Sequence, residues 1–246
     1  MRQPRRNRCA ALFLIGALVV AAGMAACGGS ITPTPLTPTI FTITTLPTID
    51  EMLSDKTLGS ASAPNQIVEY VSFWHADSAT FHQQIVLQLK TQYVDSGKAQ
   101  VTFRNLFLSG ETLNAAALAR CAGNARFFDA VDTIFRNQAS WAAASDPDAA
   151  VGRLMLGFGM SQSVVDGCVG NTALQNGLAN IHTDALSATY LLPDGTQRAG
   201  SSTQGSILAV PAVVVNGVLL DGRNTSDGSV NAAFAPTLAN IQQFLK

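Results

Sequence analysis

The sequence has few charged residues and few cysteines, and it lacks the sequence motifs typical of metal-binding and nucleic-acid-binding proteins. Lys, Arg, Asp and Glu make up 13% of its 246 residues, the formal net charge is -1, and no Lys/Arg cluster follows the first ten residues. A nucleic-acid-binding surface needs such a cluster. No C-x-x-C pair occurs among the four Cys. We therefore expect no nucleic-acid partner, no metal site and no cofactor.

Hydrophobic residues make up 47% of the chain, which is enough to bury one substantial core. We expect one folded domain with appendages.

The N-terminus has the layout of a secretory signal. Four arginines come first, an apolar run covers residues 10–22, and small residues precede Cys27. The uncharged stretch of 19 residues from Cys9 to Cys27 is marginal for a bilayer, so a retained membrane helix is the alternative. The string Met24-Ala25-Ala26-Cys27 resembles a bacterial lipobox. This implies a signal peptide over 1–26, lipid on Cys27, and a lipoprotein held on a membrane in the periplasm of the cell envelope.

A linker follows the lipobox. Residues 27–50 are rich in Thr and Pro and poor in large apolar side chains, as in the string TPTPLTPT. Such composition favours extended backbone at about 3.1 Å per residue. We predict a tether between the anchor and a folded body over 51–246.

Two cysteines remain for the body, Cys121 and Cys168. Two thiols in an oxidising compartment usually pair. Closing a loop of this length would stabilise the fold by roughly 4 kcal/mol in the chain-entropy treatment. We predict a structural disulfide.

The body opens with a strand, a helix and a strand. Residues 66–72 are rich in β-branched and aromatic residues, and residues 99–107 alternate, which favours two strands. Between them, apolar residues recur at helical spacing from Phe81 to Tyr93, with Asp77 or Ser78 as the expected cap. The order predicts a parallel strand pair joined by a crossover helix.

A helical block and a hairpin follow. The hairpin is predicted over 212–220, turning at Gly217, and a last amphipathic helix over 230–245. The helices of the block are expected over 111–122, 125–138, 147–158, 161–168 and 172–190.

This order, with several local strings, resembles the DsbA-like thioredoxin family. The strings include Glu69-Tyr70, Phe81-His82, Ala119-Arg120-Cys121-Ala122, and Gln138 with Trp141. The resemblance implies an α/β thioredoxin fold with an all-helical domain inserted at about 109–190.

The family carries C-x-x-C between the first central strand and its helix, where the helix N-terminus lowers the pKa of the first thiol. Here the string is His75-Ala76-Asp77-Ser78. Counting from Glu69-Tyr70 to Phe81-His82 leaves no gap, so His75 and Ser78 occupy the two Cys positions. Without sulfur there is no thiol-disulfide exchange. We expect a pseudoenzyme with no catalytic residue.

The family's cis-proline position matches Val210-Pro211. There the family presents backbone to an extended peptide. The resemblance implies that Trp74, His75, Asp77, Val210 and Pro211 line one groove. The expected partner is an extended polypeptide or an envelope protein. The stretch 191–208 is longer than usual for the family and could cover this groove.

Two alternatives stay open. Cys121 and Cys168 could be the working pair of an active envelope oxidoreductase, which requires an accessible thiolate at a helix start. Ser78 could serve a hydrolytic or glutathione-dependent enzyme, with His75 as a base. Of the other histidines, His82 is expected to pack on the sheet or make a polar contact, and His182 to lie on the surface.

Overall fold

The computed structural model describes residues 41–107, 111–201, 204–224 and 227–246. The predicted signal peptide and Cys27 lie outside these ranges. Among the described helices, none combines the length and the apolar character needed to cross a bilayer.

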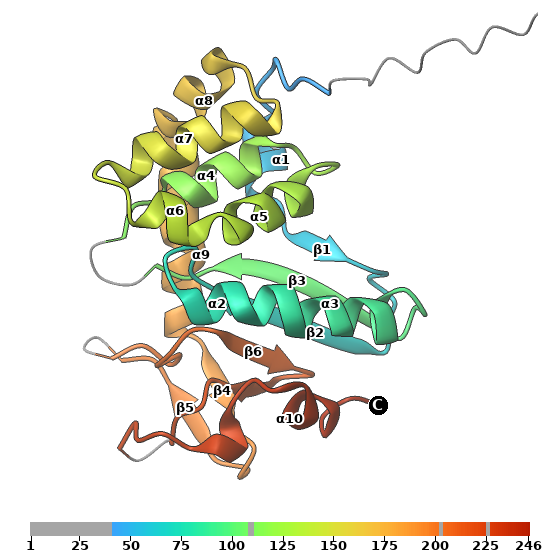
Figure 1. Ribbon diagram of the computed structural model, residues 1–246. Helices are drawn as coiled ribbons and strands as arrows, with labels where there is room; N and C mark the ends of the chain where they lie inside the picture. The colour runs from blue at the N-terminus through green and yellow to red at the C-terminus, as the bar shows by residue number, and fades with distance from the viewer. Residues whose placement is uncertain (1–40, 108–110, 202–203, 225–226) are drawn as a thin grey trace, which may run out of the picture. The chain divides into compact units, whose positions relative to one another are not determined.

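A mixed sheet forms the centre of the body (Figure 1). Its strand order is β1-β3-β2-β6-β7-β4-β5. β2 and β3 pair in parallel along their whole length, and β6 pairs antiparallel with both β2 and β7. The strands are β1 (Lys56–Leu58), β2 (Asn65–Val71), β3 (Ala99–Asn105), β4 (Thr189–Leu191), β5 (Gln197–Ala199), β6 (Ala212–Val215) and β7 (Val218–Leu220). The predicted parallel pair and the predicted hairpin are confirmed.

The crossover between β2 and β3 is helical from Ala76 to Val94. It runs through α2 (Ala76–Phe81), η1 (His82–Val86), α3 (Leu87–Leu89) and η2 (Lys90–Val94), of which η1 and η2 have π-helical hydrogen bonding. Of the predicted apolar face, Phe81, Val86 and Leu89 are buried, whereas Ile85 and Tyr93 are only partly buried.

A helical layer packs as a group beyond β1 and β3 (Figure 1). The helices are α4 (Asn114–Cys121), α5 (Phe127–Arg136), α6 (Gln138–Ala142), α7 (Pro147–Phe158), α8 (Gln162–Val169) and α9 (Thr172–Ser187). Sequence signals mark their ends: Asp146 caps α7 ahead of Pro147, and Gly159 ends it with φ of 114°. α9 ends at Ser187 because the following residues pair as β4, so the predicted helix over 172–190 is shorter than expected.

The chain before β1 packs on this helical layer. Ile43 donates its backbone N–H to Gly159 O and accepts from Ser161 N, each at 2.8 Å, and its side chain is buried. The short helix α1 (Ile49–Leu53) follows, capped by Thr48. The packed part therefore begins before the expected end of the tether at residue 50.

The predicted helix over 230–245 is wrong. The chain forms a 3₁₀ turn, η3 (Ala232–Phe234), and a short helix, α10 (Leu238–Gln242). Pro236 lies between them and donates no backbone N–H. Asn240 Nδ2 donates to the carbonyls of Ala232 and Ala235 instead, at 3.0 and 2.9 Å. Phe234 and Ile241 remain buried.

Candidate functional site

The loop from β2 into α2 lies at the same end of the sheet as the start of β6. Ala212 pairs with Tyr70, so Pro211 lies level with the residues that follow Tyr70 and lead to His75. The Val210–Pro211 peptide bond is cis. Val210, Pro211 and Trp74 are each partly exposed. The structure thus places the predicted groove residues around one end of the sheet.

His75 begins α2 as its N-cap residue, without a capping side-chain hydrogen bond. Its side chain is 42% exposed, and its Nε2 lies 3.2 Å from Glu111 Oε1. The prediction that Asp77 or Ser78 caps the helix is wrong, because both lie inside α2. The exposed Asp77 is in the first turn, where the helix dipole favours a carboxylate.

Ser78 is fully buried. Its Oγ accepts a hydrogen bond from Ser72 N at 3.2 Å, so the hydroxyl faces the backbone of the β2–α2 loop rather than solvent. A nucleophilic serine needs access to its substrate. This geometry offers none.

Four side chains at this site carried no predicted role. Ser72 Oγ donates to Glu111 Oε2 at 2.8 Å and accepts from Trp74 N at 3.0 Å. From the helical layer, Gln138 Nε2 donates to Phe73 O at 2.7 Å, and the Trp141 ring stands edge-on to Trp74 at 5.1 Å. Gln138 and Trp141 were visible as family-like strings, whereas nothing in the local sequence marks Glu111.

Cys121 and Cys168 form a disulfide in the helical layer. Both are fully buried. Cys121 is the last residue of α4, and Cys168 lies inside α8. Neither sulfur is at a helix start, where a reactive thiolate is stabilised.

The buried His82 forms an ion cluster with the buried Glu69 of the sheet and the half-exposed Asp132 of the helical layer. Its Nδ1 lies 3.2 Å from Glu69 Oε2, and its Nε2 lies 3.2 Å from Asp132 Oδ1. Burial lowers the pKa of His82, but Glu69 and Asp132 outweigh burial and raise it to about 9. The expected polar contact of His82 is confirmed. The ring also lines a cavity of about 440 Å³ with Leu87 and Phe128.

This cluster predicts a pH-dependent stability. Because the folded pKa lies above the ordinary value of 6.5, the stabilisation is complete below about pH 6.5 and is lost as pH rises through 9. We expect His82→Gln to be less stable than the native chain at pH 6, by on the order of 1–3 kcal/mol. The difference in free energy of unfolding between the two proteins should be smaller at pH 9.5 than at pH 6, as measured by urea unfolding at both pH values.

The comparison must be between native chain and variant at each pH. Burial lowers the pKa of Lys56 to about 8, and this group favours folding as pH rises over the same interval. Because Lys56 is present in both proteins, its contribution cancels in the difference between their free energies of unfolding. A gap that stays constant from pH 6 to 9.5 would contradict the role assigned to His82.

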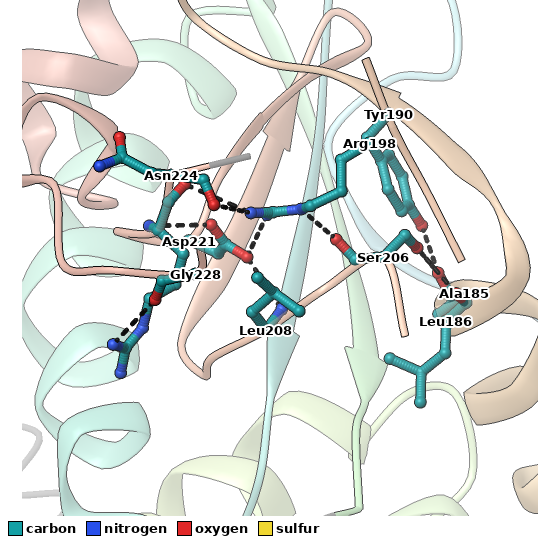
Figure 2. A network of polar contacts seen from close by, with 10 residues as sticks. Ala185, Leu186, Tyr190, Arg198, Ser206, Leu208, Asp221, Asn224 and Gly228 are labelled. Atoms are coloured by element: carbon teal, nitrogen blue, oxygen red, sulfur yellow. Dashed lines mark hydrogen bonds and ion pairs between the residues drawn. The ribbon is translucent and has the colours of Figure 1, made fainter. Parts of the chain in front are cut away.

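A second buried ion pair holds the chain that leads to Pro211 (Figure 2). Arg198 on β5 donates through Nη2 to Asp221 Oδ2 and through Nε to Ser206 O at 2.8 Å. Asp221 Oδ2 also accepts from Leu208 N at 2.9 Å. Within the described part of the stretch 191–208, β5 pairs with β4, and the residues after β5 are bonded to Arg198 and to Asp221 in the turn after β7. Val210 and Pro211 stay partly exposed.

His182 is partly exposed on α9, so it lies at the surface as expected but is half-buried there. Its Nδ1 accepts from Phe107 N at 3.2 Å. Burial lowers its pKa, and the nearby Glu111 charge opposes that change in part. Among the described residues, no group of three His, Cys, Asp or Glu side chains is arranged to hold a metal ion.

Comparison with known proteins gives consistent matches. A family model described as thioredoxin matches residues 52–232. Candidate protein-disulfide oxidoreductases are similar: that of Rickettsia prowazekii is 33% identical over 90 residues, and that of Rickettsia typhi 34% over 101 residues. The matched regions cover 36% and 41% of this chain. They span only about a third of the length of these relatives, 33% and 37%.

Solved structures share the fold. Alpha-DsbA1 of Wolbachia pipientis superposes with a TM-score of 0.58 at 20% identity, over 78% of this chain and 90% of that one. A protein-disulfide isomerase of Novosphingobium aromaticivorans gives 0.55 at 22% identity, over 73% and 92%.

Proposed function

Because this chain belongs to the DsbA-like thioredoxin-fold family, we propose that it is a redox-inactive member that holds an extended polypeptide beside Pro211. The observation that carries the proposal is the side-chain chemistry at the start of α2. An imidazole and a buried hydroxyl stand at His75 and Ser78, where the family has its two thiols. Disulfide exchange requires a sulfur to attack a sulfur.

The placement of Cys121 and Cys168 supports the absence of redox activity. A working pair needs an accessible sulfur that can be stabilised as thiolate. These two are fully buried, at the end of one helix and inside another. They fit a structural disulfide better than a catalytic one.

The exposed end of the sheet supports polypeptide binding. Val210 and Pro211 precede β6 and are partly exposed, so their backbone groups can meet an added strand. Trp74 offers a partly exposed aromatic side chain nearby. Its ring packs edge-on against Trp141, and the preceding residue, Phe73, accepts a hydrogen bond from Gln138 through its backbone carbonyl. Large aromatic side chains contribute strongly to binding interfaces.

The proposed location is the cell envelope. The lipobox-like string before Cys27 and the Thr- and Pro-rich residues 27–50 support a lipid-anchored body on a tether.

The test of the binding function is the affinity of the full chain for fluorescein-labelled extended peptides, measured by fluorescence anisotropy. Replacing Trp74 by Ala should weaken binding by roughly 10-fold or more, because the variant loses aromatic contact area. Phe128→Ala is the matched control, since this aromatic ring lines the separate cavity beside His82. If no extended peptide binds, or if both variants bind as the native chain does, the groove is not a peptide site.

A further inference from the structure

A cavity lies between the crossover helix and α5 of the helical layer. Its volume is about 440 Å³, within the range of roughly 300–1,000 Å³ that small-molecule sites occupy. Its apolar lining comes from three elements: Leu58 of β1, Val86 and Leu87 of the crossover, and Phe128 of α5. The described residues that line the cavity do not include those predicted to form the groove at Pro211.

The apolar side chains of the cavity are accessible to a ligand. Val86 forms a buried part of the lining, whereas Leu58 and Phe128 are partly exposed. Leu87 is 57% exposed. A ligand that covers such side chains removes apolar surface from water, which favours binding.

The crossover helix changes its hydrogen bonding where it lines the cavity. His82, Gln83 and Val86 belong to the π-helical η1, and Lys90 begins the π-helical η2. π-helical turns are rare and occur frequently at functional sites. The two π-helical segments are therefore a second observation, independent of the cavity volume, that points to a ligand.

Every charged side chain among the lining residues already has a partner within the protein. The pairs are His82 with Glu69 and Asp132, Arg136 with Asp132, Lys90 with Asp95, and Asp129 with Arg126. The side chains of Lys90 and Arg136 keep much of their surface in solvent, where an ion pair with a ligand would gain little. A charge placed deeper in the cavity would lose water without gaining a free counter-ion. This pairing favours an uncharged ligand.

We infer that this cavity binds an uncharged, largely apolar small molecule. The inference goes beyond the proposed function, because it assigns a second site with a different class of ligand. Gln83 is partly exposed and supplies an uncharged amide, which can exchange a hydrogen bond with a neutral polar group of the ligand.

The experiment compares two fluorescent probes that share one ring system and differ in charge, on the full chain at pH 7. N-phenyl-1-naphthylamine is uncharged, and 8-anilino-1-naphthalenesulfonate carries an added sulfonate. We expect the uncharged probe to bind with a dissociation constant on the order of 10 µM. The sulfonate should bind at least about 10-fold more weakly, because its charge finds no free cation in the cavity.

Variants locate the bound probe. Leu87→Asp puts a charge on the exposed apolar side chain of the cavity and should weaken binding of the uncharged probe by about 10-fold or more. Val230→Asp is the matched control, since Val230 is an exposed apolar residue outside the cavity, and it should bind as the native chain does. Thermal unfolding checks that Leu87→Asp is folded. If it is not, Phe128→Asp places the same charge on the α5 side and should weaken binding as much.

Three outcomes would overturn the inference. The first is that the uncharged probe does not bind. The second is that the sulfonate binds as tightly as the uncharged probe or more tightly, which would make the ligand an anion. The third is that a folded Leu87→Asp or Phe128→Asp binds as the native chain does, which would place the probe elsewhere. Peptide binding is measured separately by anisotropy, so each of these results leaves the proposed function to its own test.

Discussion

The double substitution His75→Cys with Ser78→Cys is expected to create dithiol-oxidising and insulin-reducing activity, which the proposed function predicts to be absent from the native chain. Position 75 is the N-cap of α2, where the helix dipole lowers the pKa of a thiol and favours the attacking thiolate. Position 78 lies one turn further on and is buried, as suits a second sulfur that closes the disulfide. We expect a gain of at least about 100-fold over the native chain.

The single-cysteine variants are the controls for this gain. Neither His75→Cys nor Ser78→Cys can close an intramolecular disulfide at this site, so neither should turn over. Activity in the native chain would point to Cys121 and Cys168 and refute the redox-inactive assignment. A folded double variant without activity would mean that the scaffold no longer supports the chemistry of its family.

The second large effect is expected from the buried pair of Arg198 and Asp221. Asp221→Ala should lower the free energy of unfolding by about 3–5 kcal/mol, because Arg198 would keep its charge in a buried place without its carboxylate. The hydrogen bond from Leu208 N would be lost as well. Urea unfolding of variant and native chain at pH 7 measures the difference.

An exposed pair gives the matched comparison. Lys90 and Asp95 form an ion pair at 2.7 Å on the surface of the crossover helix. Asp95→Ala should cost less than about 1 kcal/mol. Equal effects of Asp95→Ala and Asp221→Ala would show that burial does not set the strength of the Arg198 pair.

The fold was largely predictable from the sequence, because periodicity reports burial. The β-branched residues of β2 and the helical spacing from Phe81 to Tyr93 each placed an element correctly. The last helix was predicted wrongly. Its apolar stripe is buried at Phe234 and Ile241, as helical spacing implies, but Pro236 interrupts the backbone hydrogen bonding that one continuous helix would need.

The candidate site was only half predictable. The positions of His75 and Ser78 follow from gap-free counting along one segment. Glu111 and His182 come from other parts of the chain and meet His75 and Phe107 only through tertiary packing. Local pattern carries no information on such contacts, so neither the buried carboxylate nor the burial of His182 could be anticipated.

The seating of Ile43 has a mechanical consequence. Its two backbone hydrogen bonds to Gly159 and Ser161 join the entering chain to the turn between α7 and α8. A pulling force applied at Phe41 is therefore transmitted first to these two helices, and the Cys121–Cys168 bond links α8 covalently to α4. We therefore expect tension applied at Phe41 to act on the two Ile43 hydrogen bonds and the helical layer before it deforms the end of the sheet at Pro211.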